Sequence, residues 1–317
     1  MAYYLGLDAG GTKTECALAH DSTILARATA GTIKLMRAST EEAEHNLDSL
    51  LQSVSTQAGV MLSSITCTCV GLAGISVPRI ADWVRQSLHA RVSGDVLLSG
   101  DEVIALDAAF PGSAGVLVMA GTGSNIVARS SQGDLIHVGG WGPAVADEGS
   151  GNWIGKQAVR AIFDAMDRNE TTLLLPAVLS VWELPDVGSL IDRANQSPSP
   201  DFSKLTPVVV HCAEQKDPYA QRILQQAGKD LGTYALLALQ RAHVLEPAQV
   251  ALPEIAYTGS VLRHIAPVRE SMFATIRLEV PGVVLQAKAV DPVEGALWRA
   301  RQHSSLAEYT GRKSLKP

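Results

Sequence analysis

The stretch Tyr4–Leu18 reads YLGLDAGGTKTECAL, and a stretch of the same build, Val116–Ala128, reads VLVMAGTGSNIVA about one domain length further along the chain. Each consists of an apolar strand, a short turn of glycine and threonine, and a second strand. Glycines between two strands let backbone N–H groups converge on an oxyanion, because glycine tolerates positive φ and carries no Cβ. One such turn alone is equally compatible with an ordinary hairpin. The pair predicts that a polyphosphate is held between two half-domains.

The first turn does not match two familiar nucleotide-binding glycine motifs. A G-x-x-x-x-G-K-[ST] loop requires lysine directly after its second glycine, whereas Thr12 separates Gly11 from Lys13. A dinucleotide-binding fingerprint would open a helix, but the residues from Thr14 to Ala19 alternate with the period of a strand. We therefore expect a hairpin here, not a turn from strand to helix.

The composition indicates a globular chain of 317 residues that is long enough for two domains, with 46% apolar and 18% charged residues. A net charge of −6 and the lack of a Lys/Arg block disfavour nucleic acid and anionic membranes as partners. No apolar run is long enough to span a bilayer and no basic leader precedes the first strand, so we expect a cytoplasmic protein. The four cysteines, Cys16, Cys67, Cys69 and Cys212, do not have the spacing of zinc ligands, and we expect them to be buried thiols.

The order of predicted elements repeats along the chain. In the first half we expect strands at 3–8, 14–20 and 24–30, a helix from Ser39 or Thr40 to Gln57, a strand at 65–71, a helix from Pro78, a strand at 95–99 and a helix at 101–109. In the second half we expect strands at 115–120, 125–129 and 135–138, helices from Asp147 onward with a long one at 217–243, a strand at 254–258 and a terminal helix from Pro292. The loosest region is expected at 184–204, where the residues 195–200, NQSPSP, read as an exposed connection.

This repeated plan predicts an α/β protein with two ribonuclease-H-like (actin-type ATPase) domains and a nucleotide and substrate cleft between them. The expected boundaries are residues 1–114 plus about 296–317 for the N-terminal domain and 115–295 for the C-terminal domain. By resemblance to proteins of that fold, Gly295 and Ala296 would mark the return of the chain to the first domain.

Asp101 directly follows a buried-looking strand and opens a helix, a place where strand ends present groups to a cleft. Two interpretations are open: a helix N-cap, or a general base that accepts the proton of a substrate hydroxyl. Asp107 lies inside the helix and is expected to face away.

The segment Val138–Gly155, VGGWGPAVADEGSGNWIG, combines glycines, two tryptophans and the acidic pair Asp147 and Glu148. A structural interpretation makes Asp147 the cap of the helix that begins there. It does not account for the run from Gly139 to Gly142, which suits a sugar, because an aromatic face covers C–H groups while carboxylates and amides bind hydroxyls.

In their order and spacing, GLDAGGTKT, Asp101, AGTGSN, GGWGPAVADEGSGNWIG and YTGSV resemble the N-acetylglucosamine kinase and BadF-type ATPase family, within the actin, sugar kinase and Hsp70 superfamily. The resemblance covers nearly the whole chain. It implies an ATP-dependent kinase that phosphorylates an amino sugar hydroxyl, of N-acetylglucosamine or glucosamine, with ATP and Mg²⁺ as cofactors and a small sugar as partner. Whether such a chain forms a homodimer stays open.

The resemblance also implies residue roles. Asp8 would hold hydrated Mg²⁺ and Asp101 would be the base. A first phosphate loop would comprise Gly10, Gly11, Thr12 and Lys13, and a second Gly121, Thr122 and Gly123. Sugar-contacting positions would be Ser124, Asn125, Gly140, Trp141, Gly142 and Asp147. The nucleoside pocket would include Ala213, Gly259 and Ser260.

One departure concerns the substrate. Relatives that phosphorylate N-acetylglucosamine tend to place an asparagine after the third strand, where this chain reads GTIKLMR from Gly31 to Arg37. Lys34 and Arg37 are either solvated surface charges, or one of them binds an acidic group such as the lactyl carboxylate of N-acetylmuramic acid.

A second class of function stays open beside the kinase. BadF-type relatives include ATPase activators of a dehydratase or reductase, which hold an iron–sulfur cluster through cysteines at a dimer interface. The tryptophan-bearing loop at Trp141 favours the kinase, whereas Cys67 and Cys69 lie in a predicted core strand. A third class, a nucleotide-responsive scaffold without catalysis, is disfavoured by the presence of Asp101 and both glycine turns.

Overall fold

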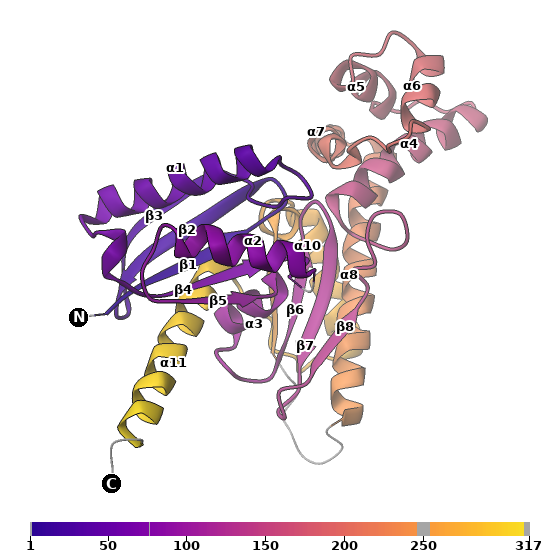
Figure 1. Ribbon diagram of the computed structural model, residues 1–317. Helices are drawn as coiled ribbons and strands as arrows, with labels where there is room; N and C mark the ends of the chain where they lie inside the picture. The colour runs from indigo at the N-terminus through magenta and orange to yellow at the C-terminus, as the bar shows by residue number, and fades with distance from the viewer. Residues whose placement is uncertain (1, 76, 246–253, 314–317) are drawn as a thin grey trace. The chain divides into compact units, whose positions relative to one another are not determined.

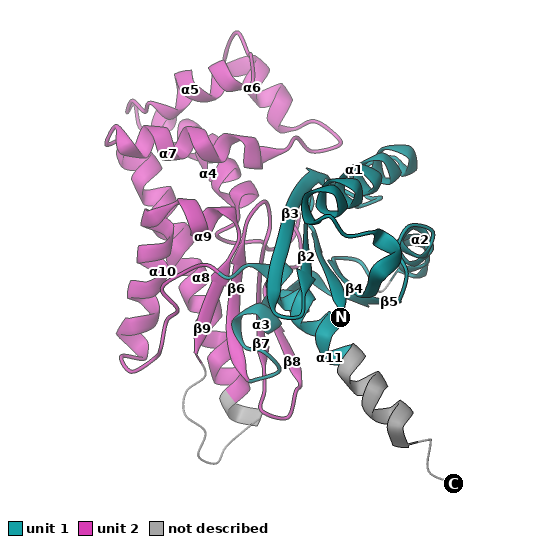
Figure 2. Cartoon of the chain, turned by 90° about the vertical axis from the view of Figure 1, so that its left-hand side faces the viewer, with its two compact units in different colours: residues 1–113, 290–317 teal, residues 114–289 magenta. Residues whose placement is uncertain are grey.

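The computed structural model describes residues 2–75, 77–245 and 254–313, with side chains up to residue 242 before the gap and up to residue 303 at the C-terminal end. The chain forms two compact units (Figure 2), Met1–Ser113 with Val290–Pro317 as unit 1 and Ala114–Ala289 as unit 2. The return to unit 1 therefore falls just before the terminal helix. Whether the two units are domains with the predicted limits stays a prediction.

Unit 1 is a five-stranded mixed sheet covered by helices. Its elements are β1 (Tyr3–Ala9), β2 (Lys13–His20), β3 (Thr23–Gly31), α1 (Thr40–Ala58), η1 (Leu62–Ser64), β4 (Ile65–Leu72), α2 (Pro78–His89), β5 (Asp95–Ser99), α3 (Asp101–Ala109) and α11 (Pro292–Lys313). The strand order is β3-β2-β1-β4-β5. The three N-terminal strands form an antiparallel meander, and β4 and β5 continue it in parallel. The predicted hairpin and βα alternation are both present.

Two separate apolar clusters lie on the two faces of this sheet, and Figure 1 shows α1 on one side of the sheet and α11 on the other. Leu5 and Leu7 of β1 belong to the cluster that also contains the buried residues of α1 and α2. Tyr4 belongs to the opposite cluster, with α3 and α11. Helix α11 lies very close to the sheet, because a Cβ at Gly6 would lie 2.8 Å from the Leu297 side chain. The last helix thus completes the core of the unit that the first strand begins.

Local sequence signals set the ends of α1 as expected. The Ser39 hydroxyl accepts a hydrogen bond from the Glu42 N–H, which satisfies one of the free donors of the first turn. Gly59 ends the helix with φ 65°, a conformation in which glycine carries no steric penalty.

Unit 2 repeats the hairpin but has a smaller sheet. Its elements are β6 (Gly115–Ala120), β7 (Ser124–Arg129), β8 (Leu135–Val138), α4 (Gly151–Asp167), α5 (Leu174–Val181), α6 (Val187–Ala194), η2 (Phe202–Leu205), α7 (Thr206–Glu214), α8 (Pro218–Leu245), β9 (Ile255–Thr258), α9 (Ser260–His264) and α10 (Ala266–Glu279). The strand order is β8-β7-β6-β9. Beyond β9, a single parallel bridge joins Ile255 to Leu285, at the position that β5 takes in unit 1.

The residues 195–200 are an exposed connection, as predicted, but the wider region 184–204 also contains regular structure. Helix α6 occupies its middle, because the Asp186 carboxylate accepts a hydrogen bond from the Ser189 N–H and Leu190 is fully buried. A cap and one buried apolar residue suffice for a short helix that packs on a larger core.

The four cysteines are buried thiols, as predicted. Cys67 and Cys69 lie on β4 with no exposed surface, in the cluster that packs against α11. Burial raises the pKa of the Cys69 thiol to about 12, so it stays protonated. None of the helices in the described part of the chain is long and apolar enough to cross a bilayer.

Candidate active site

The first glycine turn links β1 and β2 and has open space where a side chain would stand. A Cβ at Gly11 would meet no atom within 4 Å, and the side chains of Thr12 and Lys13 are exposed. The expectation that these turns use glycine for its positive φ is wrong. Neither Gly10 nor Gly11 has positive φ, and the same holds for Gly121 and Gly123. Gly11 and Gly123 leave open space at the two turns, whereas a Cβ at Gly10 would lie 2.9 Å from the Lys13 carbonyl oxygen.

Asp8 lies at the end of β1, beside this turn, in a group of carboxylates. Burial and the negative charges of Asp101, Glu15 and Asp291 raise the pKa of Asp8 to about 7, while the ammonium of Lys34 lowers it. Carboxylates that repel one another gain from a nearby cation, and oxygen is the ligand that Mg²⁺ prefers.

The donors around Asp8 do not form a closed protein cage. Among the residues that the structure describes, no three His, Cys, Asp or Glu side chains come together as a metal site. A single carboxylate that completes its shell with water and phosphate oxygens is the usual way in which Mg²⁺ binds with a nucleotide. The residues present therefore fit Mg²⁺ brought by a nucleotide, not a permanently held ion.

Asp101 is the first residue of α3 and is not its N-cap. The cap position is Gly100, and the Asp101 Oδ1 atom accepts a hydrogen bond from the Glu102 N–H at 3.2 Å. The side chain keeps 28% of its surface exposed, and its Oδ2 lies 3.6 Å from the Lys34 Nζ. Asp107 points the other way, as predicted, and pairs with Arg299 of α11 in the core. The second oxygen of Asp101 is thus turned toward a cation and solvent.

Glu102 is a further ionisable group at this place. Burial, the hydrogen bond with Asp101 and the negative charge of Asp101 raise the pKa of Glu102 to about 7, and the Lys34 ammonium lowers it. The side chain folds back along the turn before the helix, because a Cβ at Gly100 would lie 2.3 Å from its Oε1. The base candidate therefore has an acidic neighbour as well as a basic one.

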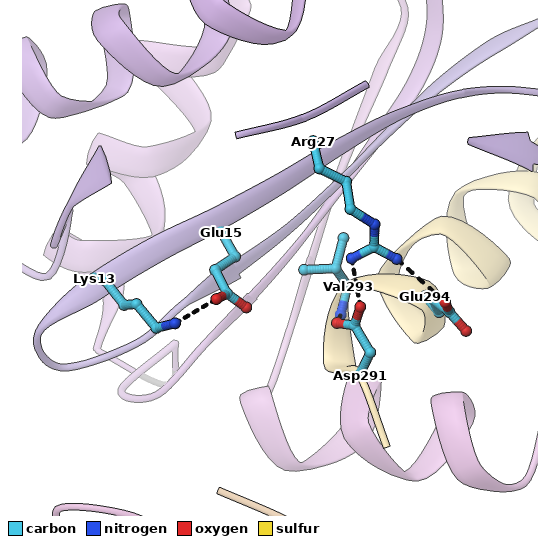
Figure 3. A network of polar contacts seen from close by, with 6 residues as sticks. All are labelled: Lys13, Glu15, Arg27, Asp291, Val293 and Glu294. Atoms are coloured by element: carbon cyan, nitrogen blue, oxygen red, sulfur yellow. Dashed lines mark hydrogen bonds and ion pairs between the residues drawn. The ribbon is translucent and has the colours of Figure 1, made fainter. Parts of the chain in front are cut away.

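A second polar network lies on the same unit (Figure 3). Lys13 pairs with Glu15, and Arg27 of β3 pairs with Asp291 and, at 3.2 Å, with Glu294. Asp291 also accepts a hydrogen bond from the Val293 N–H, so it caps the start of α11. The network fixes the start of the terminal helix against β3 and holds the Asp291 charge near Asp8.

The second glycine turn joins β6 and β7 and is held by the start of α4. The Gly151 N–H donates to the Gly121 carbonyl at 2.7 Å, and the Asn152 N–H donates to the Thr122 carbonyl at 3.1 Å. A Cβ at Gly123 would meet no atom within 4 Å. With its carbonyls already bound, the turn has an open side at Gly123.

The loop between β8 and α4 is a tight hairpin that displays Trp141. A backbone bridge pairs Gly142 with Ala146, and the Trp141 side chain is 70% exposed. Gly140 has φ 72°, and a Cβ there would lie 2.6 Å from the Asn125 side chain. A glycine is therefore required at 140, and it brings Asn125 and this loop together.

Asp147 is buried and does not cap α4. The N-cap is Ser150, whose hydroxyl accepts a hydrogen bond from the Trp153 N–H and donates to the Asp147 carboxylate at 2.8 Å. Burial raises the pKa of Asp147 and this hydrogen bond lowers it. The Ser124 hydroxyl donates to the Glu148 carbonyl at 2.9 Å, which fixes the same loop to β7.

The residues expected in the nucleoside pocket lie on two elements of unit 2. Gly259 has φ 95°, and a Cβ there would lie 2.2 Å from the Ala120 carbonyl oxygen. The same close approach puts the Ser260 hydroxyl 3.7 Å from a Cβ built on Gly121, beside the second turn. Ala213 lies on α7, partly buried against the core of the unit. Ser260 is thus adjacent to the second turn, and the role of Ala213 stays a prediction.

The BadF/BadG/BcrA/BcrD ATPase family model matches residues 5–300. The chain belongs to this family. Its sequence is 27% identical to the N-acetylmuramic acid/N-acetylglucosamine kinase of Clostridium acetobutylicum, over 95% of this chain and 99% of the relative. It is 23% identical to the N-acetyl-D-glucosamine kinase of Dictyostelium discoideum, over 92% of this chain and 96% of the relative.

A candidate N-acetylglucosamine kinase from Chromobacterium violaceum has the same fold, with a TM-score of 0.72 and 27% identity over 94% of this chain and 98% of that one. The α/β architecture is therefore the one that sugar kinases share with actin-type ATPases. The resemblance seen in the sequence and the predicted fold class are both confirmed.

Sequence reasoning missed three groups near Asp8 and Asp101. Glu102 stood next to Asp101 and could have been flagged as an adjacent carboxylate. Thr32 and Asp291 gave no such signal, because their neighbours come from distant parts of the chain: Thr32 donates to the Gly10 carbonyl, and Asp291 binds Arg27.

Proposed function

We propose that this chain is an ATP-dependent kinase that phosphorylates a hydroxyl of an amino sugar, with Asp101 as the general base. The observation that carries this proposal is the group formed in unit 1 by the first glycine turn, Asp8 and Asp101, in which a partly exposed carboxylate stands near an open backbone turn. Relatives that match almost the full length of the chain are named amino sugar kinases. The family and the geometry point to the same reaction.

In this reaction the substrate hydroxyl attacks the γ-phosphorus of ATP, its proton passes to the Asp101 carboxylate, and ADP leaves. Positioning and charge stabilisation supply most of the rate in phosphoryl transfer, so a carboxylate suffices as base. We assign the phosphates to the turns at Gly10–Lys13 and Gly121–Gly123, and the nucleoside to Ala213, Gly259 and Ser260. Asp8 would hold Mg²⁺, which neutralises phosphate charge when bound.

We assign the sugar to the loop that displays Trp141. The exposed indole offers an apolar face for C–H groups, and we assign Ser124, Asn125, Gly140, Gly142 and Asp147 to the same sugar site. Asp147 is held by Ser150, so its carboxylate is oriented before a ligand arrives. Carboxylates and amides bind sugar hydroxyls, while an aromatic face covers C–H groups.

A neutral amino sugar fits the charges better than an acidic one. Lys34 is not a solvated surface charge, because its side chain is only 14% exposed and already faces Asp101. Arg37 is exposed. The Lys34 ammonium acts on Asp8 and on Glu102 as well, so a substrate carboxylate would compete with three protein carboxylates for one cation. We therefore propose N-acetylglucosamine or glucosamine as substrate class, with N-acetylmuramic acid as the alternative.

The activator alternative requires cysteines that can reach a cluster at an interface. Cys67 and Cys69 are fully buried on a central strand, and the other two cysteines are buried as well. To bind iron they would have to leave the core, at the loss of about 1–3 kcal/mol of packing for each side chain. The burial supports the kinase proposal.

The test is Asp101→Asn, which keeps the size of the side chain but cannot accept the hydroxyl proton. We expect kcat for N-acetylglucosamine to fall by about 10²–10⁴ while ATP affinity, measured by calorimetry, stays within about threefold of wild type. Asp107→Asn is the matched control for a carboxylate of the same helix that faces the core; it should lower stability, not the activity of the folded fraction. Turnover by Asp101→Asn within about threefold of wild type would refute the assignment.

A further inference from the structure

The segment that follows β3 connects the first glycine turn to Asp101 by direct contacts. The Thr32 hydroxyl donates to the Gly10 carbonyl at 2.8 Å and accepts from the Lys34 N–H at 3.1 Å. The Lys34 ammonium then lies 3.6 Å from the Asp101 carboxylate. Three consecutive contacts thus lead from the backbone of the turn to the base, all within unit 1.

Further contacts hold this segment rigidly. The Ile33 N–H donates to the Thr14 hydroxyl at 3.2 Å, and the Asn46 side-chain amide donates to the Thr32 carbonyl at 2.9 Å. Thr14, Thr32 and Ile33 are all buried. A segment fixed at both its backbone and its side chains gives Lys34 little freedom, so its ammonium has a defined place.

We infer that Lys34 is a positioning residue for Asp101 and that Thr32 couples the orientation of this pair to the first glycine turn. This inference rests on the proposed function. Lys34 attracts one oxygen of Asp101, and the Glu102 N–H binds the other, so the carboxylate is fixed at both oxygens. A shift of the turn around Gly10 when phosphate binds would move Thr32, and through it the ammonium that orients the base.

Solvent exposure separates this pair from an ordinary surface ion pair. An exposed pair contributes little, because water screens it and two long side chains lose freedom. Here the Lys34 side chain is mostly buried, and the carboxylates of Asp8, Glu102, Glu15 and Asp291 act on the same region. Removal of the Lys34 charge would leave Asp101 among carboxylates of like sign, so its orientation would change.

The experiment compares Lys34→Met, Lys34→Arg and Thr32→Val with Arg37→Met, an exposed cation of the same segment, as control. We expect Lys34→Met to lower kcat about 10- to 100-fold for neutral and acidic amino sugars alike, with KM for the sugar within about threefold of wild type. Lys34→Arg should restore kcat to within about threefold, and Arg37→Met should change nothing. Thr32→Val should lower kcat and weaken ATP binding in calorimetry.

The double variant Thr32→Val/Lys34→Met tests the coupling. If the two residues act along one chain of contacts, the loss in kcat is smaller than the product of the two single losses. A loss in kcat of the double variant that equals the product of the two single losses overturns the inference. So does a Lys34→Met enzyme with wild-type kcat. A Lys34→Met enzyme that loses only its activity on N-acetylmuramic acid also overturns it, since that would make Lys34 a substrate contact. A wild-type chain that binds ATP but phosphorylates no amino sugar would instead refute the proposed function.

Discussion

Replacement of Asp8 by asparagine should stabilise the ligand-free protein, by an amount that grows as pH rises from about 4 to about 7. The pKa of Asp8 is raised from 3.8 to about 7 in the folded chain by burial and by the charges of Asp101, Glu15 and Asp291. A carboxyl group with a raised pKa binds its proton more tightly in the folded state than in the unfolded one. Its contribution to stability is therefore complete below about pH 4 and is lost as pH rises through about 7.

The size of the effect follows from the shift. Three pKa units at about 1.4 kcal/mol each give about 4 kcal/mol as an upper limit for the loss at pH 8. Residual access of the carboxylate to water reduces this figure, so we expect Asp8→Asn to gain between about 1 and 4 kcal/mol at pH 8. At pH 5 the folded carboxyl is still protonated but the unfolded one is ionised, so a difference of up to about 1.7 kcal/mol is already present, and the two proteins should have similar free energies of unfolding only near pH 4.

The assay is urea unfolding of both proteins at pH 4, 5, 6, 7 and 8 without nucleotide and with a chelator for divalent ions. Asp48→Asn is a control of opposite sign, because the hydrogen bond from Arg91 lowers the pKa of Asp48 and its loss should destabilise the protein at neutral pH. A gain for Asp8→Asn that is equal at pH 5 and pH 8, or absent at pH 8, would refute the reasoning.

Two further predictions concern glycines. Gly123→Val should leave the free energy of unfolding within about 0.5 kcal/mol, because a Cβ there meets no atom within 4 Å, but should weaken ATP binding about 10- to 100-fold by obstructing hydrogen bonds to phosphate. Calorimetry with ATP and with sugar separates the effects, and equal losses in both affinities would make the turn structural. Gly295→Ala should destabilise the protein by about 3 kcal/mol or more despite the better helix propensity of alanine, because its Cβ would lie 1.8 Å from the Ile104 carbonyl oxygen. Gly282→Ala, with open space around its Cβ, is the control in urea unfolding, and equal midpoints would contradict the close contact.

The sequence predicted those parts of the fold that local chemistry determines. The hairpins around Gly10 and Gly121 and the caps of α1 at Ser39 and Gly59 follow from residues that lie next to each other in the chain. The start of α4 was placed too early, because Asp147 and Ser150 are both good N-caps by type. Only the fold decides between them, by burying Asp147 as an acceptor for the Ser150 hydroxyl.

The environment of Lys34 could not be predicted. A lysine after a strand is usually solvated, but the contacts that fix Lys34 and the neighbouring Thr32 come from the first glycine turn, α1 and α3, which are far apart in sequence. The prediction of positive φ for the glycines of the two turns was wrong for a similar reason. Glycine in a turn suggests positive φ, yet at Gly11 and Gly123 what matters is empty space, which no local pattern reveals.

The two units use the same hairpin, but the residues beside the turn are charged in unit 1 and uncharged in unit 2. In unit 1 the second-last residue pair before the turn is Asp8 opposite Glu15. In unit 2 the corresponding pair is Met119 opposite Asn125. A carboxylate at the end of β1 lowers the stability of the ligand-free chain near neutral pH and favours a bound cation, whereas Met119 brings no such charge. Backbone N–H groups can bind phosphate in both turns, but groups that bind a metal ion or accept a proton require ionised oxygens. The base and the metal ligand are therefore expected on the same unit, and unit 2 contributes the second phosphate turn together with amides, hydroxyls and an aromatic face for the uncharged parts of the ligands.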